Sequence, residues 1–166
     1  MTIARVALVL ACAAWCAAPA ARAQEDIGIS VGATAPGAVV HTLDGKRVNL
    51  SQYLGKGPVV LEFWATWCSN CKELEPTFLS LVKQYSPQVT FIDVAVSVNQ
   101  SPERVKLYAQ KYHYTHQVLY DTDGNAVTAY NVPATSYVVL IDKTGKVVYT
   151  GLGGDQNIAA AIKKVL

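Results

Sequence analysis

Two cysteines separated by two residues stand out in the stretch FWATWCSNCKELEP, residues 63–76. An apolar run precedes Cys68, and apolar residues recur at helical spacing after Cys71, so the pair falls where a strand passes into a helix. Unpaired N–H groups and the positive end of the helix dipole stabilise a thiolate there, and the thiolate is the nucleophile of disulfide exchange. The spacing therefore predicts a dithiol cycle in which Cys68 attacks a partner disulfide and Cys71 resolves the mixed disulfide.

Other roles for the two cysteines are weaker candidates. A purely structural disulfide would close a very short loop and gain little entropy. A zinc site needs about four ligands, and the histidines that could complete one are His41, His113 and His116, all three expected to be surface residues. We therefore predict no zinc site. Binding of Cu(I) by the two soft thiolates, as in a metallochaperone, stays open as the alternative function.

The residues next to the pair are expected to shape its surroundings. Trp67 should cover one side of Cys68, whereas Trp64 should lie in the core. Ser69 and Asn70, between the cysteines, bring no histidine and no positive charge that would favour a thiolate. The helix end is thus the main stabiliser of the thiolate that the sequence predicts.

The N-terminal residues predict export. Arg5 precedes an alanine-rich apolar stretch that ends in the small-residue triplet 21–23, the layout of a secretory signal peptide (residues 1–23) cleaved after Ala23. The apolar run 6–18 is short for a membrane span. We expect a periplasmic or otherwise exported protein, with an uncleaved, membrane-anchored form as the alternative.

Composition and charge narrow the class of protein. Removal of the signal peptide leaves two of the four cysteines, which excludes a small disulfide-rich domain. The net charge of +2 is not concentrated in a basic run, so no nucleic-acid partner is expected. Residues 24–35 are small and polar and predict a loose lead-in, and residues 36–166 suffice for one domain with its own core.

Apolar patterning places the elements that hold the cysteine pair. PVVLEFWA (58–65) and VTFIDVAVSV (89–98) are nearly continuous apolar runs, typical of strands buried on both faces. Ser101 and Pro102 predict a helix start, and Asp155 is expected to cap a last helix. Strands that alternate with helices predict an α/β fold with a mixed central β-sheet flanked by helices and an N-terminal β-hairpin extension.

The stretch TLDGKRVNLSQYLGKGPVVLEFWATWCSNCKELEP, followed by a later VYTG hairpin, resembles the exported thioredoxin-like proteins of the TlpA/ResA type. The resemblance covers most of residues 36–166. It implies a thioredoxin-like fold and a thiol–disulfide oxidoreductase that reduces protein disulfides in cytochrome c maturation or metal-centre assembly. It also implies a membrane-embedded electron donor, and no cofactor is expected.

The resemblance implies roles for two acidic residues near the cysteines. Glu62 lies six residues before Cys68, where thioredoxins keep a buried aspartate. Burial should raise its pKa and let it exchange a proton with Cys71. Glu75 lies one helical turn after Cys71, on the same helix face. Many proteins of this type have their acid one position earlier, where this chain has Leu74.

These carboxylates also predict the direction of electron flow. A strong oxidant stabilises its thiolate form, whereas Glu62 and Glu75 would raise the thiol pKa values. We therefore predict a disulfide reductase. A peroxidase of the peroxiredoxin kind is a less favoured alternative, because its PxxxTxxC pattern has Leu61 in place of the proline and Ala65 in place of the threonine.

The chain departs from the family pattern opposite the cysteines. Thioredoxin-like proteins place a cis-proline there, just before a strand. Counting back from Asp142, that position falls on Ser136, whereas the nearest proline is Pro133. Either the loop is rearranged so that Pro133 serves, or Ser136 takes the place with an ordinary trans bond, since a cis bond without proline costs about 2.5–4 kcal/mol.

Overall fold

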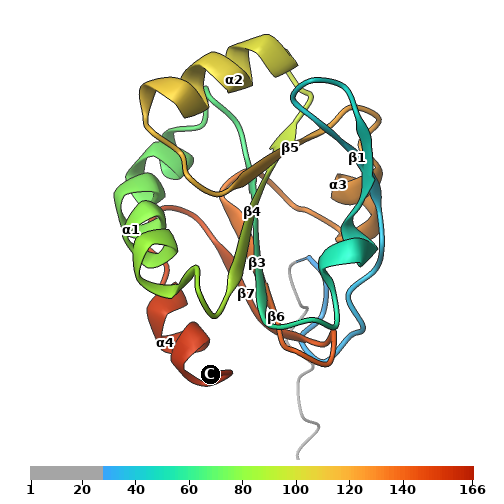
Figure 1. Cartoon of the computed structure of the whole chain (residues 1–166), viewed down its shortest axis with the longest axis vertical. Coiled ribbons are helices and arrows are strands. Elements are labelled where there is room, and N and C mark those ends of the chain that lie inside the picture. The colour runs from blue at the N-terminus through green and yellow to red at the C-terminus, as the bar shows by residue number, and fades with distance from the viewer. Residues whose placement is uncertain (1–27) are drawn as a thin grey trace, which may run out of the picture.

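The computed structural model describes residues 28–166 (Figure 1). The predicted signal peptide, residues 1–23, and its cleavage site lie outside the described residues. None of the helices from residue 28 onward combines the length and the hydrophobicity that a membrane span requires.

A seven-stranded mixed sheet with the strand order β2-β1-β5-β4-β3-β6-β7 forms the centre of the molecule. β3, β4 and β5 pair in parallel, and the other neighbouring strands pair antiparallel. The predicted N-terminal hairpin is the β1–β2 pair. The bounds are β1 (Val39–Thr42), β2 (Arg47–Asn49), β3 (Val59–Trp64), β4 (Thr90–Val96), β5 (Gln117–Asp121), β6 (Tyr137–Ile141) and β7 (Val147–Leu152).

Helices cover both faces of this sheet, as Figure 1 shows with α1 and α4 on one side and α3 on the other. The helices are α1 (Ser69–Tyr85), α2 (Pro102–Lys111), α3 (Asn125–Ala129), α4 (Ile158–Lys163) and a short 3-10 helix (Leu50–Tyr53). The predicted α/β architecture, a mixed central sheet flanked by helices, is therefore confirmed.

β3 is the strand that carries the chain into the cysteine pair, and all six of its residues are buried. Leu61 and Phe63 pack into the core on the α3 side, whereas Val60 and Trp64 point to the α1 side. Because successive strand residues alternate between faces, Glu62 shares the α1 side with Val60 and Trp64. Trp64 is a core residue, as predicted.

Two details differ from the sequence-based expectations. The last helix is capped by Asn157, whose side chain accepts a hydrogen bond from Ala160 N (3.2 Å), and not by Asp155. The helix starts two residues later than predicted, because asparagine caps as well as aspartate and stands next to the first apolar residue, Ile158.

The described end of the predicted lead-in, residues 28–35, packs against the domain instead of lying loose. Gly32 N donates to Val147 O (2.7 Å) and Ala35 N donates to Gly145 O (2.9 Å), so this segment runs along the β6–β7 hairpin. Ile29 belongs to the core on the α3 side. Backbone hydrogen bonds to the hairpin compensate here for the small, polar composition of the segment.

Candidate active site

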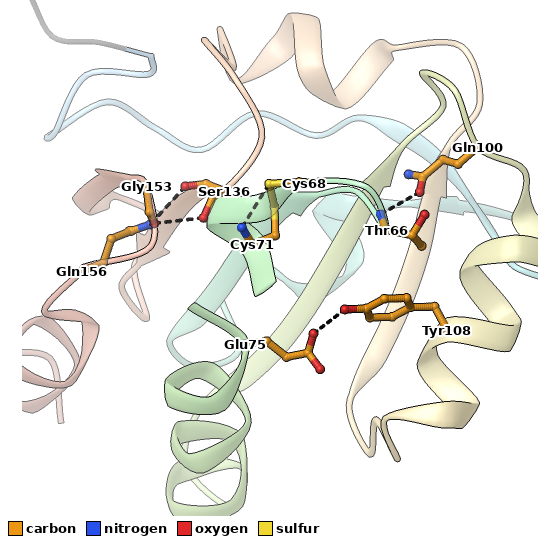
Figure 2. The surroundings of a disulfide bond; sticks show 9 residues. All are labelled: Thr66, Cys68, Cys71, Glu75, Gln100, Tyr108, Ser136, Gly153 and Gln156. Atoms are coloured by element: carbon orange, nitrogen blue, oxygen red, sulfur yellow. Dashed lines mark hydrogen bonds between the residues drawn. A yellow bond between two sulfur atoms is a disulfide. The ribbon is translucent and has the colours of Figure 1, made fainter. Parts of the chain in front are cut away.

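A disulfide joins Cys68 and Cys71, with 5.3 Å between their Cα atoms, where β3 passes into α1 (Figure 2). Cys68 is the N-cap residue of α1, and its Sγ accepts a hydrogen bond from Cys71 N (3.0 Å). The predicted position at a helix N-terminus is confirmed. In the reduced protein, a Cys68 thiolate would keep this N–H donor and the positive end of the helix dipole.

Both cysteines are almost covered in this oxidised form, with 5% of Cys68 and 4% of Cys71 exposed. Cys68 is covered in this state because, as N-cap, its side chain folds back over the first helical turn. The exposed rim consists of Trp67, Ser69 and Asn70. The Trp67 indole donates to Val98 O (2.8 Å), which fixes the ring against the loop after β4.

Gln100 holds the loop between β3 and the cysteines, a role that the sequence analysis missed. Its Oε1 accepts a hydrogen bond from Thr66 N (2.9 Å), and its Nε2 donates to Val96 O (2.6 Å). Tyr120 Oη donates to the Gln100 backbone carbonyl (2.7 Å). Figure 2 shows the hydrogen bond between Gln100 and Thr66 to the right of the disulfide. In the sequence, Gln100 could be placed only in the loop before the helix-capping Ser101.

Ser136, and not Pro133, meets the end of β3. Ser136 is fully buried directly before β6, and its N donates to Phe63 O (2.8 Å). It adopts a left-handed backbone conformation with φ of 64°, and no cis peptide bond occurs among residues 28–166. Pro133 is exposed in the preceding loop. Of the two candidates left open by the sequence, Ser136 therefore stands at the position opposite the pair.

The loop after β7 saturates the polar groups of Ser136, to the left of the disulfide in Figure 2. Ser136 Oγ donates to Gly153 O (2.9 Å), and Ser136 O accepts from Gly153 N and from Gln156 Nε2 (both 3.0 Å). Gln156 Nε2 also donates to Gly153 O (2.6 Å). These bonds fix the left-handed turn that a serine rarely adopts.

Glu62 is buried on the α1 side of β3, with 4% of the residue exposed, which confirms the predicted burial. Its register partner in the parallel pair is Asp93 of β4, so the two side chains lie on the same face at the strand spacing of about 4.8 Å. Burial, and then the charges of Asp93 and Glu75, raise the pKa of Glu62 well above its ordinary value. Such a rise brings the pKa of the carboxyl closer to that of a thiol, which favours proton exchange between the two groups.

Glu75 is half-buried and turns toward α2. Tyr108 Oη donates to its carboxylate (2.6 Å), as Figure 2 shows. Burial, together with this hydrogen bond, raises the pKa of Tyr108. Leu74, at the position where many TlpA/ResA-type proteins have their acid, is fully buried in the core on the α1 side.

His116 contradicts the expectation of a surface histidine. Its side chain is 2% exposed, and its Nε2 lies 3.0 Å from Oδ2 of the equally buried Asp93. At this distance a protonated imidazole forms a close ion pair with the Asp93 carboxylate. His116 stands two positions before Val118 of β5, and the two-residue period of a strand places both side chains on the same buried face. His113, three residues earlier, is exposed as expected.

Aromatic rings enclose this ion pair. Tyr114 stacks on the His116 ring at 5.0 Å between centroids, and Phe78 of α1 lies 5.6 Å from it. Within residues 28–166, no group of three or more Cys, His, Asp or Glu side chains is arranged to hold a metal ion. Buried Glu62 and Asp93 and half-buried Glu75 thus form a layer of acids on the α1 side of the sheet, near the disulfide, with one imidazole among them.

Comparisons with known proteins agree with this site. The Redoxin family pattern matches residues 30–166. The thiol-disulfide oxidoreductase ResA of Geobacillus thermodenitrificans is 33% identical over 143 residues, which cover 85% of this chain and 81% of the relative. ResA of Bacillus subtilis is 39% identical over 120 residues, covering 72% of this chain and 66% of the relative.

Among solved structures, the thioredoxin domain of a thiol-disulfide oxidoreductase from Bacteroides vulgatus has the same fold. The TM-score is 0.71 at 23% identity, and the match covers 83% of this chain and 99% of that domain. The family match, the ResA relatives and a CxxC disulfide at the strand–helix junction lead to one assignment. The chain belongs to the Redoxin family, as a thiol–disulfide oxidoreductase of the TlpA/ResA type with a thioredoxin-like fold.

Proposed function

We propose that the protein is an exported disulfide reductase, in which Cys68 attacks the substrate, Cys71 resolves the mixed disulfide and Glu62 exchanges a proton with Cys71. The observation that carries this proposal is the acid layer near the disulfide, where Glu62 and Asp93 are buried side by side. Glu75 lies near enough for its charge to act on Glu62.

The reaction starts from the reduced protein. The Cys68 thiolate attacks one sulfur of a substrate disulfide, a new S–S bond forms, and the other substrate sulfur leaves as a thiolate. Cys71 then passes its proton to the Glu62 carboxylate and attacks the Cys68 sulfur. This step re-forms the internal disulfide and releases the second substrate thiolate. Two electrons have moved to the substrate, whose thiolates take up protons from water.

The charge of the site supports reduction over oxidation. Strong oxidants stabilise their reduced, thiolate form. Here the carboxyls of Glu62, Asp93 and Glu75 share the α1 side of the sheet, and negative charge close to a thiol disfavours the thiolate. The helix N-terminus offers stabilisation to Cys68 alone, through the N–H of Cys71.

The location and partners rest on the sequence. The signal-like residues 1–23 and the TlpA/ResA resemblance support a periplasmic protein, cleaved after Ala23 or held at the membrane if cleavage does not occur. The same resemblance supports substrates among exported proteins of cytochrome c maturation or metal-centre assembly. Electrons would return to the Cys68–Cys71 disulfide from a membrane-embedded donor.

The reduction potential of the Cys68–Cys71 pair tests this proposal. Residues 24–166 are equilibrated in redox buffers and the free thiols are trapped. We expect a value near or below that of thioredoxin, roughly −270 mV, and covalent capture of substrates by Cys71→Ser. A value near roughly −120 mV, typical of strong oxidants, would overturn the direction. If no internal disulfide formed, Cu(I) binding by the reduced pair would become the better account.

A further inference from the structure

We propose that the buried Asp93–His116 ion pair is a positioning element of the redox site, which holds a positive charge beside Asp93, the register partner of Glu62, and so keeps the Glu62 carboxyl able to exchange a proton with Cys71. The inference rests on the proposed role of Glu62. It gives a function to two residues that the dithiol cycle alone does not use.

The charges on this face of the sheet are unbalanced without His116. The titratable side chains that face one another here, from β3, β4, α1, α2 and the segment before β5, are Glu62, Asp93, Glu75, Tyr108, Tyr114 and His116. Three are carboxyls and two are phenols, so the imidazole is the one group of the six that can carry a positive charge. Among the described residues, no lysine or arginine forms an ion pair with these carboxyls.

The surroundings of the pair favour the charged imidazole. Burial, the largest single effect, lowers the pKa of His116, but the charge of Asp93 and its hydrogen bond to the ring together outweigh burial and raise the pKa. Phe78 and Tyr114 pack against the ring, so water does not screen the pair as it would at the surface. A charge in such an enclosed place acts strongly on its neighbours.

The charge of His116 acts on Glu62 through Asp93. Asp93 is its register partner on the adjacent strand, and the Asp93 charge disfavours ionisation of Glu62. The positive charge of His116, 3.0 Å from the Asp93 carboxylate, offsets that effect. Without it, buried Glu62 would face an uncompensated carboxylate and hold its proton permanently, so it could not accept the proton of Cys71.

The native protein allows a first test by NMR. The His116 ring protons are titrated in the oxidised and in the reduced protein, with exposed His113 as the internal control. Coupling between two sites is reciprocal, so we expect the His116 midpoint to be higher in the reduced form, which carries additional negative charge. The His113 midpoint should not change. An identical His116 midpoint in both redox states would overturn the inference.

Substitutions supply the second test, in which the reduction potential is measured from pH 5 to pH 9. The potential of the wild-type protein should change slope at the pH where Glu62 ionises, and Glu62→Gln should remove that break. His116→Gln should move the break to higher pH. Adding Asp93→Asn to His116→Gln removes the uncompensated charge as well and should return the break toward its wild-type position. His113→Asn, at a left-handed φ of 55° that suits asparagine, is the matched control without effect.

The outcomes separate this inference from the proposed function. If Glu62→Gln removes the break and His116→Gln leaves it in place, the ion pair has no part in the site, while the role of Glu62 stands. If the double variant shifts the break as far as His116→Gln does, the effect is one of packing and not of charge, and the inference fails. A wild-type potential without any break would overturn both the inference and the role of Glu62.

Discussion

Two buried aspartates in neighbouring strands differ in how fully their carboxylate oxygens are hydrogen-bonded. Asp121, at the end of β5, accepts hydrogen bonds from Ala126 N (3.2 Å) and Val127 N (2.8 Å) at the start of α3. Asp93, in the middle of β4, has the His116 ion pair on one oxygen, and its other oxygen has no hydrogen-bond partner in the described part of the chain.

The difference reflects two uses of burial. Gly124, the N-cap of α3, has no side chain that could cap the helix, so Asp121 replaces it from the preceding strand. Both of its oxygens are satisfied, and it contributes to stability. The layer around Asp93 leaves polar groups unsatisfied, which costs stability. Such a layer persists where it serves chemistry, and here it lies near the redox-active pair.

Neutralising Asp121 should have the largest effect on stability. In Asp121→Asn the amide offers one acceptor where two N–H groups need one each, and the charge at the helix start is lost. We expect a loss of about 2 kcal/mol in the free energy of unfolding, measured by urea denaturation. The reduction potential of the folded variant should equal that of the wild type. A change in the reduction potential would show that Asp121 also influences the redox site.

Neutralising a carboxyl in the acid layer should instead increase the free energy of unfolding at neutral pH. A carboxyl whose folded pKa is raised, such as Glu62, destabilises the protein as pH rises from its unfolded value of 4.5 toward its folded value. The raised pKa of His116 adds a contribution that is complete below pH 6.5 and disappears as pH rises through the folded value. Wild-type stability should therefore fall from about pH 4.5 through neutral pH.

Glu62→Gln checks the first part of this pH dependence. The variant should match the wild type below pH 4.5 and be more stable at neutral pH, because it lacks a group that burial prevents from ionising. Urea denaturation at several pH values measures both curves. A variant that is less stable than the wild type at neutral pH would show that Glu62 contributes a structural hydrogen bond, as Asp121 does.

The two regions also differ in how far the sequence reveals them. Local patterns predicted the cysteine pair at the start of α1, the burial of Glu62 in β3 and the α/β architecture. The partners of Glu62 could not be found in this way. Asp93 and His116 become its neighbours only through the strand order β5-β4-β3, and periodicity along the chain does not encode which strands lie side by side.

The details that the sequence left wrong or open had two different causes. Asn157 and Asp155 are both good capping residues, and only the packed position of Ile158 selects the first. Ser136 could be placed by counting from the following strand, but its left-handed conformation depends on hydrogen bonds to Gly153 and Gln156. Those residues belong to a loop that is distant in sequence, so the shape opposite the cysteines was not accessible from local patterns.

Removing the contact between α1 and α2 should have the smallest effect and tests whether Glu75 influences Glu62. Tyr108→Phe removes the hydrogen bond from Tyr108 Oη to the Glu75 carboxylate. Because Glu75 is only half-buried, water can replace the lost donor, and we expect a loss of about 1 kcal/mol or less in the free energy of unfolding. Tyr108→Phe keeps the Glu75 carboxylate in place and should therefore leave the break in the potential–pH curve close to its wild-type position. Tyr112→Phe, which alters an exposed hydroxyl on the same stretch of chain, is the matched control. A shift as large as that of His116→Gln would mean that Glu75, and not the Asp93–His116 pair, governs the ionisation of Glu62.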